Sequence, residues 1–63
     1  MTLYHRDLEL LAHLASGLPM HRIAERLGMS PRTLRRRMRH LCDRIGVTTP
    51  IEAVAWAARR DLI

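Results

Sequence analysis

The sequence predicts an all-α domain of four helices, and three observations lead to this fold class. Apolar residues recur at intervals of three and four along most of the chain, the spacing that gives a helix one hydrophobic face. Glycine and proline divide the chain into four such segments. Aromatic residues are scarce, with one Trp, one Tyr and no Phe, and few residues are β-branched, which disfavours strands. We therefore expect helices at about residues 4–16, 20–27, 31–45 and 50–60.

The first expected helix has a broad apolar face and ends before a glycine. Apolar residues at i, i+3, i+4 and i+7, with two more beside them, form this face: Leu8, Leu11, Ala12, Ala15, Leu10 and Leu14. The polar residues of the segment are expected on the solvent side: Arg6, Asp7, Glu9 and His13. Gly17 follows where a helix commonly ends in a left-handed residue.

Prolines and a serine mark the starts of the second and third helices. Pro19 is expected in the first turn of the second helix, where a missing N–H costs nothing, and Gly28 ends that helix. Ser30 is a good N-cap residue and is followed by Pro31. The buried stripe of the third helix lies within about 40° of its first member on a helical wheel: Leu34, Met38, Leu41 and Ile45. Two helices joined by so short a turn predict a helix-turn-helix.

The fourth helix carries its own start signal. Thr49 is followed by Pro50 and then by Glu52, which is the pattern of a capping box with proline at the first helical position. Arg59 and Arg60 suit the negative end of the helix dipole. We expect a helix that begins sharply at Pro50.

Length and composition restrict the class of protein. Sixty-three residues form a single domain with a small core and no room for a deep substrate cleft, and the chain has the size of a module of a larger protein. The one cysteine, Cys42, excludes an intrachain disulfide and is expected at the edge of the core. No signal peptide and no membrane-spanning segment are evident, so a cytoplasmic location is expected.

No pattern in the sequence predicts an enzyme, a metal site or a cofactor. The four histidines lie 8, 8 and 19 residues apart, and one cysteine is too few for a zinc site. Ser30 is better explained as an N-cap than as a nucleophile, and Asp7 and Glu9 point to different faces of one helix. We therefore expect a binding module.

The net charge of +5 is concentrated in the third helix. Residues 32–44 contain six arginines and one acid, Asp43, whereas the rest of the chain holds five arginines and five acids. The arginines lie on the side of the helix away from Leu34 and on its two shoulders. Their repulsion, relieved only by Asp43, favours a polyanionic partner, and a basic helix in a helix-turn-helix indicates DNA.

Two other interpretations stay open on these residues. The arginines could form a solvated face. Alternatively, the fourth helix, with its alanine-rich face and Trp56, could dock on another domain or on RNA polymerase, which would make the chain a protein-interaction module.

Six different short motifs follow one another along the chain. They are Leu3 with Arg6 and Asp7, then A-S-G-L at 15–18, I-A-E-R-L at 23–27, S-P-R-T-L at 30–34, R-I-G-V at 44–47 and A-V-A-W-A at 53–57. This pattern resembles the C-terminal DNA-binding domain of LuxR-type (GerE, NarL/FixJ class) bacterial regulators. The departures are Asp7 where that family commonly has Glu, Arg37 where it usually has His, and His40 where it often has Asn.

The resemblance implies a LuxR-type helix-turn-helix that binds double-stranded DNA, with the third helix in the major groove. It implies base contacts from three arginines: Arg35, Arg36 and Arg39. It implies phosphate contacts from Met20, His21, Ser30, Arg32, Thr33, Arg37 and Arg44. It further implies a homodimer on inverted half-sites, with the fourth-helix residues Ala55, Trp56 and Ala58 in the interface. The resemblance also implies a bacterial regulator that is cytoplasmic and is associated with the nucleoid when it is bound to DNA. A sigma factor's promoter −35 module shares the helix-turn-helix and remains the alternative within DNA binding, although the capped fourth helix favours the LuxR-type assignment.

Overall fold

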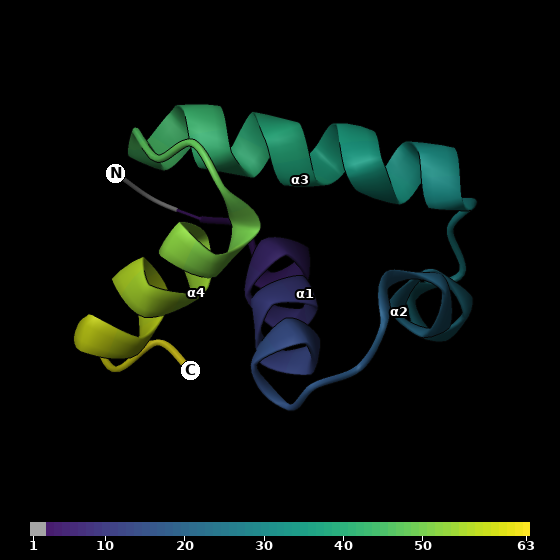
Figure 1. Ribbon diagram of the computed structural model, residues 1–63, viewed down its shortest axis with the longest axis horizontal. Helices are drawn as coiled ribbons and strands as arrows, with labels where there is room; N and C mark the ends of the chain where they lie inside the picture. The colour runs from purple at the N-terminus through teal and green to yellow at the C-terminus, as the bar shows by residue number, and fades with distance from the viewer. Residues whose placement is uncertain (1–2) are drawn as a thin grey trace.

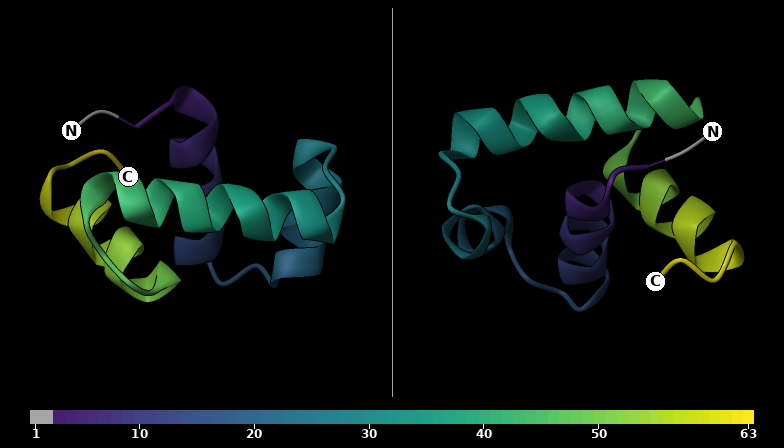
Figure 2. Two further views of the ribbon diagram at one scale, coloured as in Figure 1. Left: turned by 90° about the horizontal axis from the view of Figure 1, so that it is seen from above. Right: turned by 180° about the vertical axis from the view of Figure 1, so that it is seen from behind.

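The structure, a computed structural model, describes residues 3–63 and contains four α-helices joined by short turns. They are α1 (His5–Ala15), α2 (Met20–Leu27), α3 (Pro31–Ile45) and α4 (Pro50–Arg59). Residues 3–63 contain no strand, so the expected all-α class is confirmed, and every helix lies within a residue of its expected ends. Helix α3 spans the molecule, with α2 beneath its first turns, α4 near its last turns and α1 between them (Figure 1). The views from above and from behind show the same arrangement (Figure 2).

The helix ends follow the residues that predicted them, except at Pro19 and at Glu52. The Ser30 hydroxyl accepts a hydrogen bond from the backbone N–H of Thr33 at 3.1 Å. Gly28 and Gly46 end α2 and α3 in the left-handed conformation, with φ of 67° and 80°. Pro19 is the N-cap of α2 and has an extended backbone, so it precedes the first turn instead of lying in it. Both conformations share the φ to which proline is restricted, which is why the sequence did not separate them.

Half of the expected capping box forms at the start of α4. The Thr49 hydroxyl accepts from the backbone N–H of Glu52 at 3.2 Å, as expected. The Glu52 carboxylate reaches one residue further back than the box requires, and it accepts from the backbone N–H of Thr48 at 3.2 Å and from the Thr48 hydroxyl at 3.1 Å. The backbone donor of Thr48, followed by its hydroxyl, lowers the pKa of Glu52 from its ordinary value of 4.5.

This cap makes part of the stability of the domain sensitive to acid. Because the pKa of Glu52 is lower in the folded than in the unfolded chain, its contribution is present above pH 4.5 and is lost as pH falls through the lowered pKa. Urea denaturation between pH 3 and pH 7 should show that wild type exceeds Glu52→Gln in stability at neutral pH and that this difference shrinks in acid. Thr48→Val, which lacks the hydroxyl donor, should reduce the pH-dependent part. A wild-type advantage that does not vary with pH would contradict this cap.

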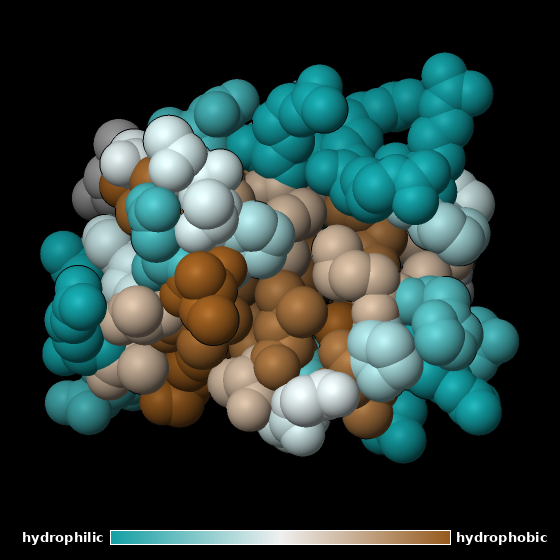
Figure 3. Space-filling model, viewed as in Figure 1, coloured by the Kyte–Doolittle hydropathy of each residue, from teal (hydrophilic) through white to brown (hydrophobic). Residues whose placement is uncertain are grey.

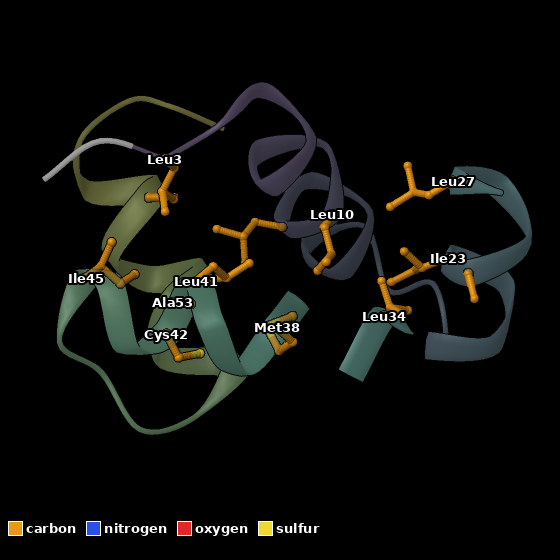
Figure 4. Close-up of a cluster of buried hydrophobic side chains, with 13 residues drawn as sticks. Leu3, Leu10, Ile23, Leu27, Leu34, Met38, Leu41, Cys42, Ile45 and Ala53 are labelled. Carbon is orange, nitrogen blue, oxygen red and sulfur yellow. The ribbon is translucent and has the colours of Figure 1, made fainter. Parts of the chain in front are cut away.

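The core lies where α1, α3 and α4 meet and extends to α2 (Figure 4). Leu10 and Leu11 of α1 and Leu41 of α3 are fully buried, as is Ala53 of α4. At the other end of α3, Leu34 faces Ile23 and Leu27 of α2. The stripe predicted for α3 is confirmed, since all four of its members are buried. One continuous core therefore fixes α3 along its whole length.

The buried face of α1 differs from the expected one. All four leucines of α1 are buried or half-buried, whereas Ala12 and Ala15 are exposed. The long leucine side chains reach between the helices that surround α1, and the alanines lie at the rim of the contact. Asp7, expected in solvent, is only 1% exposed, so this prediction was wrong.

Cys42 is buried at the edge of the core, as expected. Its thiol donates to the backbone carbonyl of Thr49 at 3.7 Å, which connects α3 to the start of α4. Burial raises the pKa of the Cys42 thiol, and the nearby carboxylates of Asp43 and Glu52 raise it further. The thiolate, the reactive form, is therefore disfavoured. Separately, no helix within residues 3–63 has the length and hydrophobicity of a transmembrane segment.

Candidate nucleic-acid interface

The outer face of α3 is a strip of exposed side chains that are basic except for one acid, Asp43. Its exposed residues besides Pro31 and Thr33 are Arg32, Arg35, Arg36, Arg39, His40 and Asp43. Hydrophilic surface runs along the upper edge of the molecule over most of α3, while most of the hydrophobic surface in the same view lies below it (Figure 3). The ion pairs that α3 forms within residues 3–63 involve Arg37 and Arg44, and none involves an arginine of this exposed set. The exposed arginines thus form no ion pair with a carboxylate of residues 3–63.

Arg37 and Arg44 lie on one side of α3 and share a carboxylate of α1. The Nη1 atom of Arg44 lies 3.0 Å from Oδ2 of Asp7, and that of Arg37 lies 3.4 Å from Oδ1. Oδ2 of Asp7 also accepts from the backbone N–H of Tyr4 at 3.2 Å. The Arg44 guanidinium lies over the Tyr4 ring, 4.6 Å from its centroid. Asp7 is therefore a buried charge with its partners in place, the condition under which a charge is tolerated inside a protein.

Sequence reasoning assigned the relief of arginine repulsion to Asp43 alone, and this was wrong. Asp7 lies 30 residues before Arg37 and 37 before Arg44, so the contact depends on how α1 and α3 cross. One signal was present in the sequence. Arg37 and Arg44 are seven residues apart, which places them two turns apart on the same side of the helix, at the margin of the buried stripe.

Arg6, the neighbour of Asp7, connects α1 to the other helix of the helix-turn-helix. Its Nη2 atom donates to the backbone carbonyl of Leu27 at 2.6 Å. That carbonyl belongs to the last residue of α2, where backbone acceptors have no partner within the helix. Arg6 is exposed, as expected, but its contact with α2 was not predicted. Consecutive residues in the first turn of α1 therefore hold the end of α2 and the side of α3.

The start of α2 and the outer face of α3 surround a shared cavity of about 480 Å³. Met20 of α2 lines it together with Arg35 and Arg39 of α3, and Thr48 closes it from the turn before α4. Met20 is half-buried, whereas His21 is exposed. The structure thus brings together a candidate phosphate contact at the N-terminus of α2 and two candidate base readers.

The candidate phosphate contacts at the start of α3 form a polar group. The Ser30 and Thr33 hydroxyls are hydrogen-bonded to each other at 3.0 Å, and both residues are exposed. Arg32 between them is also exposed. These side chains cluster at the N-terminal end of α3, where the helix dipole favours an anion.

A comparison with protein families gives a match over nearly the whole chain. The model described as bacterial regulatory proteins, luxR family (GerE), matches residues 1–57. The chain belongs to this family. Family membership supports a DNA-binding, regulatory role with double-stranded DNA as the partner. No curated protein and no solved structure gives a significant match.

The fourth helix of this LuxR-family domain places the candidate dimer residues on different sides. Ala58 is exposed and Ala55 is half-buried, but Trp56 packs against the core and holds the Arg60 guanidinium 4.1 Å from its ring centroid. Among the large hydrophobic residues of the described range 3–63, Ile51 is the most exposed, at 78%. Ile51, Val54, Ala55 and Ala58 follow the i, i+3, i+4, i+7 spacing of one helix face. Ile51 and Val54 were not among the predicted interface residues, although this spacing places them on the same face as Ala55 and Ala58.

No group of three or more His, Cys, Asp or Glu side chains within residues 3–63 is arranged to hold a metal ion.

Proposed function

We propose that this LuxR-family domain binds double-stranded DNA sequence-specifically, as part of a bacterial transcriptional regulator, with α3 in the major groove. The observation that carries the proposal is the exposed arginine strip of α3, which has no carboxylate partner in the described chain. An α-helix fits the major groove, and a recognition helix reads bases mainly with its N-terminal part. The strip is densest in that part, from Arg32 to Arg39.

Each side chain has a role that suits its chemistry. Arg35, Arg36 and Arg39 read base edges, because the planar guanidinium donates two parallel hydrogen bonds to O6 and N7 of guanine. Backbone phosphates are contacted by residues around the margin of α3 and at the start of α2: Met20, His21, Ser30, Arg32, Thr33, Arg37 and Arg44. The phosphate contacts set the register of α3 in the groove, and the base contacts supply the specificity.

We further propose that two copies pair through α4 on inverted half-sites. The support is the apolar face of α4, which borders a cavity of about 330 Å³ lined by Leu14 and Ala15 of α1 and by Pro50, Ile51 and Val54. Ala55 and Ala58 continue this face, whereas Trp56 packs on the core on another side of α4 and enters the proposed interface only through the family pattern. RNA polymerase is the alternative partner for this surface.

Selection of binding sites from random DNA duplexes, read at two salt concentrations, tests the proposal. We expect an enriched palindrome, because two copies related by a two-fold axis read the same half-site twice. Neutralising about five phosphates per domain predicts a slope of log affinity against log salt of about −4 to −5 per domain. Absence of any enriched site would contradict specific binding.

An asymmetric enriched site, together with co-purification with RNA polymerase core and no pairing on DNA, would favour the sigma-like module. Salt-insensitive partner binding that survives charge reversal at Arg36 and Arg39 would favour the protein-interaction module.

A further inference from the structure

A second cavity, of about 290 Å³, lies on the side of α3 that faces the start of α1. Thr33, Arg36, His40 and the Asp7-bound arginines line it from α3. Tyr4 and Asp7 line it from the N-terminal side. Basic and hydroxyl side chains therefore surround this hollow, and the one carboxylate in its lining is already paired with two arginines.

The two arginines held by Asp7 keep most of their hydrogen-bonding capacity. Each uses one terminal nitrogen on the carboxylate, whereas a guanidinium carries five N–H donors. The side chains of Arg37 and Arg44 remain 34% and 33% exposed. Two positive charges against one negative charge leave this cluster with an excess of +1, before Arg36 is counted.

The contacts of Asp7 and Tyr4 fix the positions of the N–H donors of Arg37 and Arg44. Asp7 is 1% exposed and is held by the backbone N–H of Tyr4, so its two oxygens are set by the first turn of α1. Arg44 is held a second time by the Tyr4 ring. A free arginine side chain loses much rotamer freedom when it binds a phosphate, and a pre-oriented one loses less.

We propose that Asp7 is a positioning residue for DNA binding, which orients Arg37 and Arg44 so that their remaining N–H groups bind a backbone phosphodiester at this cavity. The inference rests on the proposed DNA-binding function and deepens it. In this arrangement a buried acid strengthens the binding of a polyanion, because the pre-orientation of two arginines outweighs one added negative charge.

The positioning role of Asp7 is tested by whether removal of its charge raises or lowers the affinity for DNA. Asp7→Asn removes one negative charge, so charge alone would tighten DNA binding. If Asp7 positions the arginines, the variant binds DNA more weakly than wild type does, by about eightfold at 0.1 M salt for each phosphate that is no longer neutralised. The slope of log affinity against log salt also becomes less steep, by about 0.9 per phosphate. Asp43→Asn is the matched control, since it makes the same charge change on the exposed side of α3. We expect it to bind as tightly as wild type or more tightly.

Arg37→Gln and Arg44→Gln keep the test decisive if Asp7→Asn does not fold, because each leaves Asp7 with one arginine. Circular dichroism establishes which variants are folded. In folded protein, each is expected to flatten the salt slope by about 0.9 and to weaken binding to selected and random duplexes equally.

The inference is overturned if the glutamine variants keep the wild-type slope, or if Asp7→Asn binds as Asp43→Asn does. The proposed DNA-binding function would still stand in either case if the wild-type protein binds the selected duplex and this binding depends on Arg36 and Arg39. Failure of the Asp7 inference is therefore distinguishable from failure of the proposed function.

Discussion

Leu41→Ala is expected to destabilise the domain by about 2–5 kcal/mol, the range for truncating a fully buried leucine. Leu41 is 0% exposed and lies in the core between α3, α1 and α4. A domain of this size has a free energy of unfolding of roughly 3–9 kcal/mol. The substitution therefore removes at least about a fifth of this free energy of unfolding, and the expected result is a clearly lower urea midpoint.

Urea denaturation followed by circular dichroism measures this loss, and the melting temperature should fall by about 4–8 °C per kcal/mol. Ile51→Ala is the matched control, because it also truncates an aliphatic side chain of a helix but at a residue that is 78% exposed. We expect it to change stability by no more than about 0.5 kcal/mol. Equal losses at Leu41 and Ile51 would show that the core is not placed as the structure has it.

The features of the fold that depend on local sequence could be predicted. Ser30, Gly28 and Gly46 act on residues within one turn of themselves, so their roles follow from residue type and spacing. The stripe of α3 was equally accessible, because a single helix period defines it. The predicted burial of Ala12 and Ala15 in α1 was wrong because three helices surround α1. The periodicity of α1 does not show which part of its surface those helices cover.

The contacts of Arg6 and Asp7 could not be predicted in the same way. Both residues are charged and lie near the start of a helix, where solvent exposure is the ordinary expectation. Their partners are the last carbonyl of α2 and two arginines of α3, at separations of 21 to 37 residues. Such contacts arise only once the helices are packed. The family pattern places an acid at the position of Asp7, but the sequence does not show which groups that acid binds.

The double variant Arg36→Ala, Arg39→Ala is expected to lose specific DNA binding while keeping its fold. Each arginine that reads a base contributes about 1–3 kcal/mol, so the pair should weaken binding to the selected duplex by roughly 2–6 kcal/mol. Both side chains are exposed and neither forms an ion pair within residues 3–63, so their removal leaves the core and the Asp7 ion pairs intact. They lie three residues apart on one helix face, so their effects need not add.

The measurement that identifies base reading is the ratio of affinities for the selected duplex and a scrambled one. Removal of charge alone lowers both affinities by the same factor, whereas removal of base-reading side chains lowers the ratio. Arg59→Ala is a charge control, since it removes one positive charge, half of the loss in the double variant, from an exposed residue at the far end of α4. We expect Arg59→Ala to keep the ratio and the double variant to bring it close to one. If the double variant keeps the wild-type ratio, Arg36 and Arg39 do not read bases, and specificity resides elsewhere on α3.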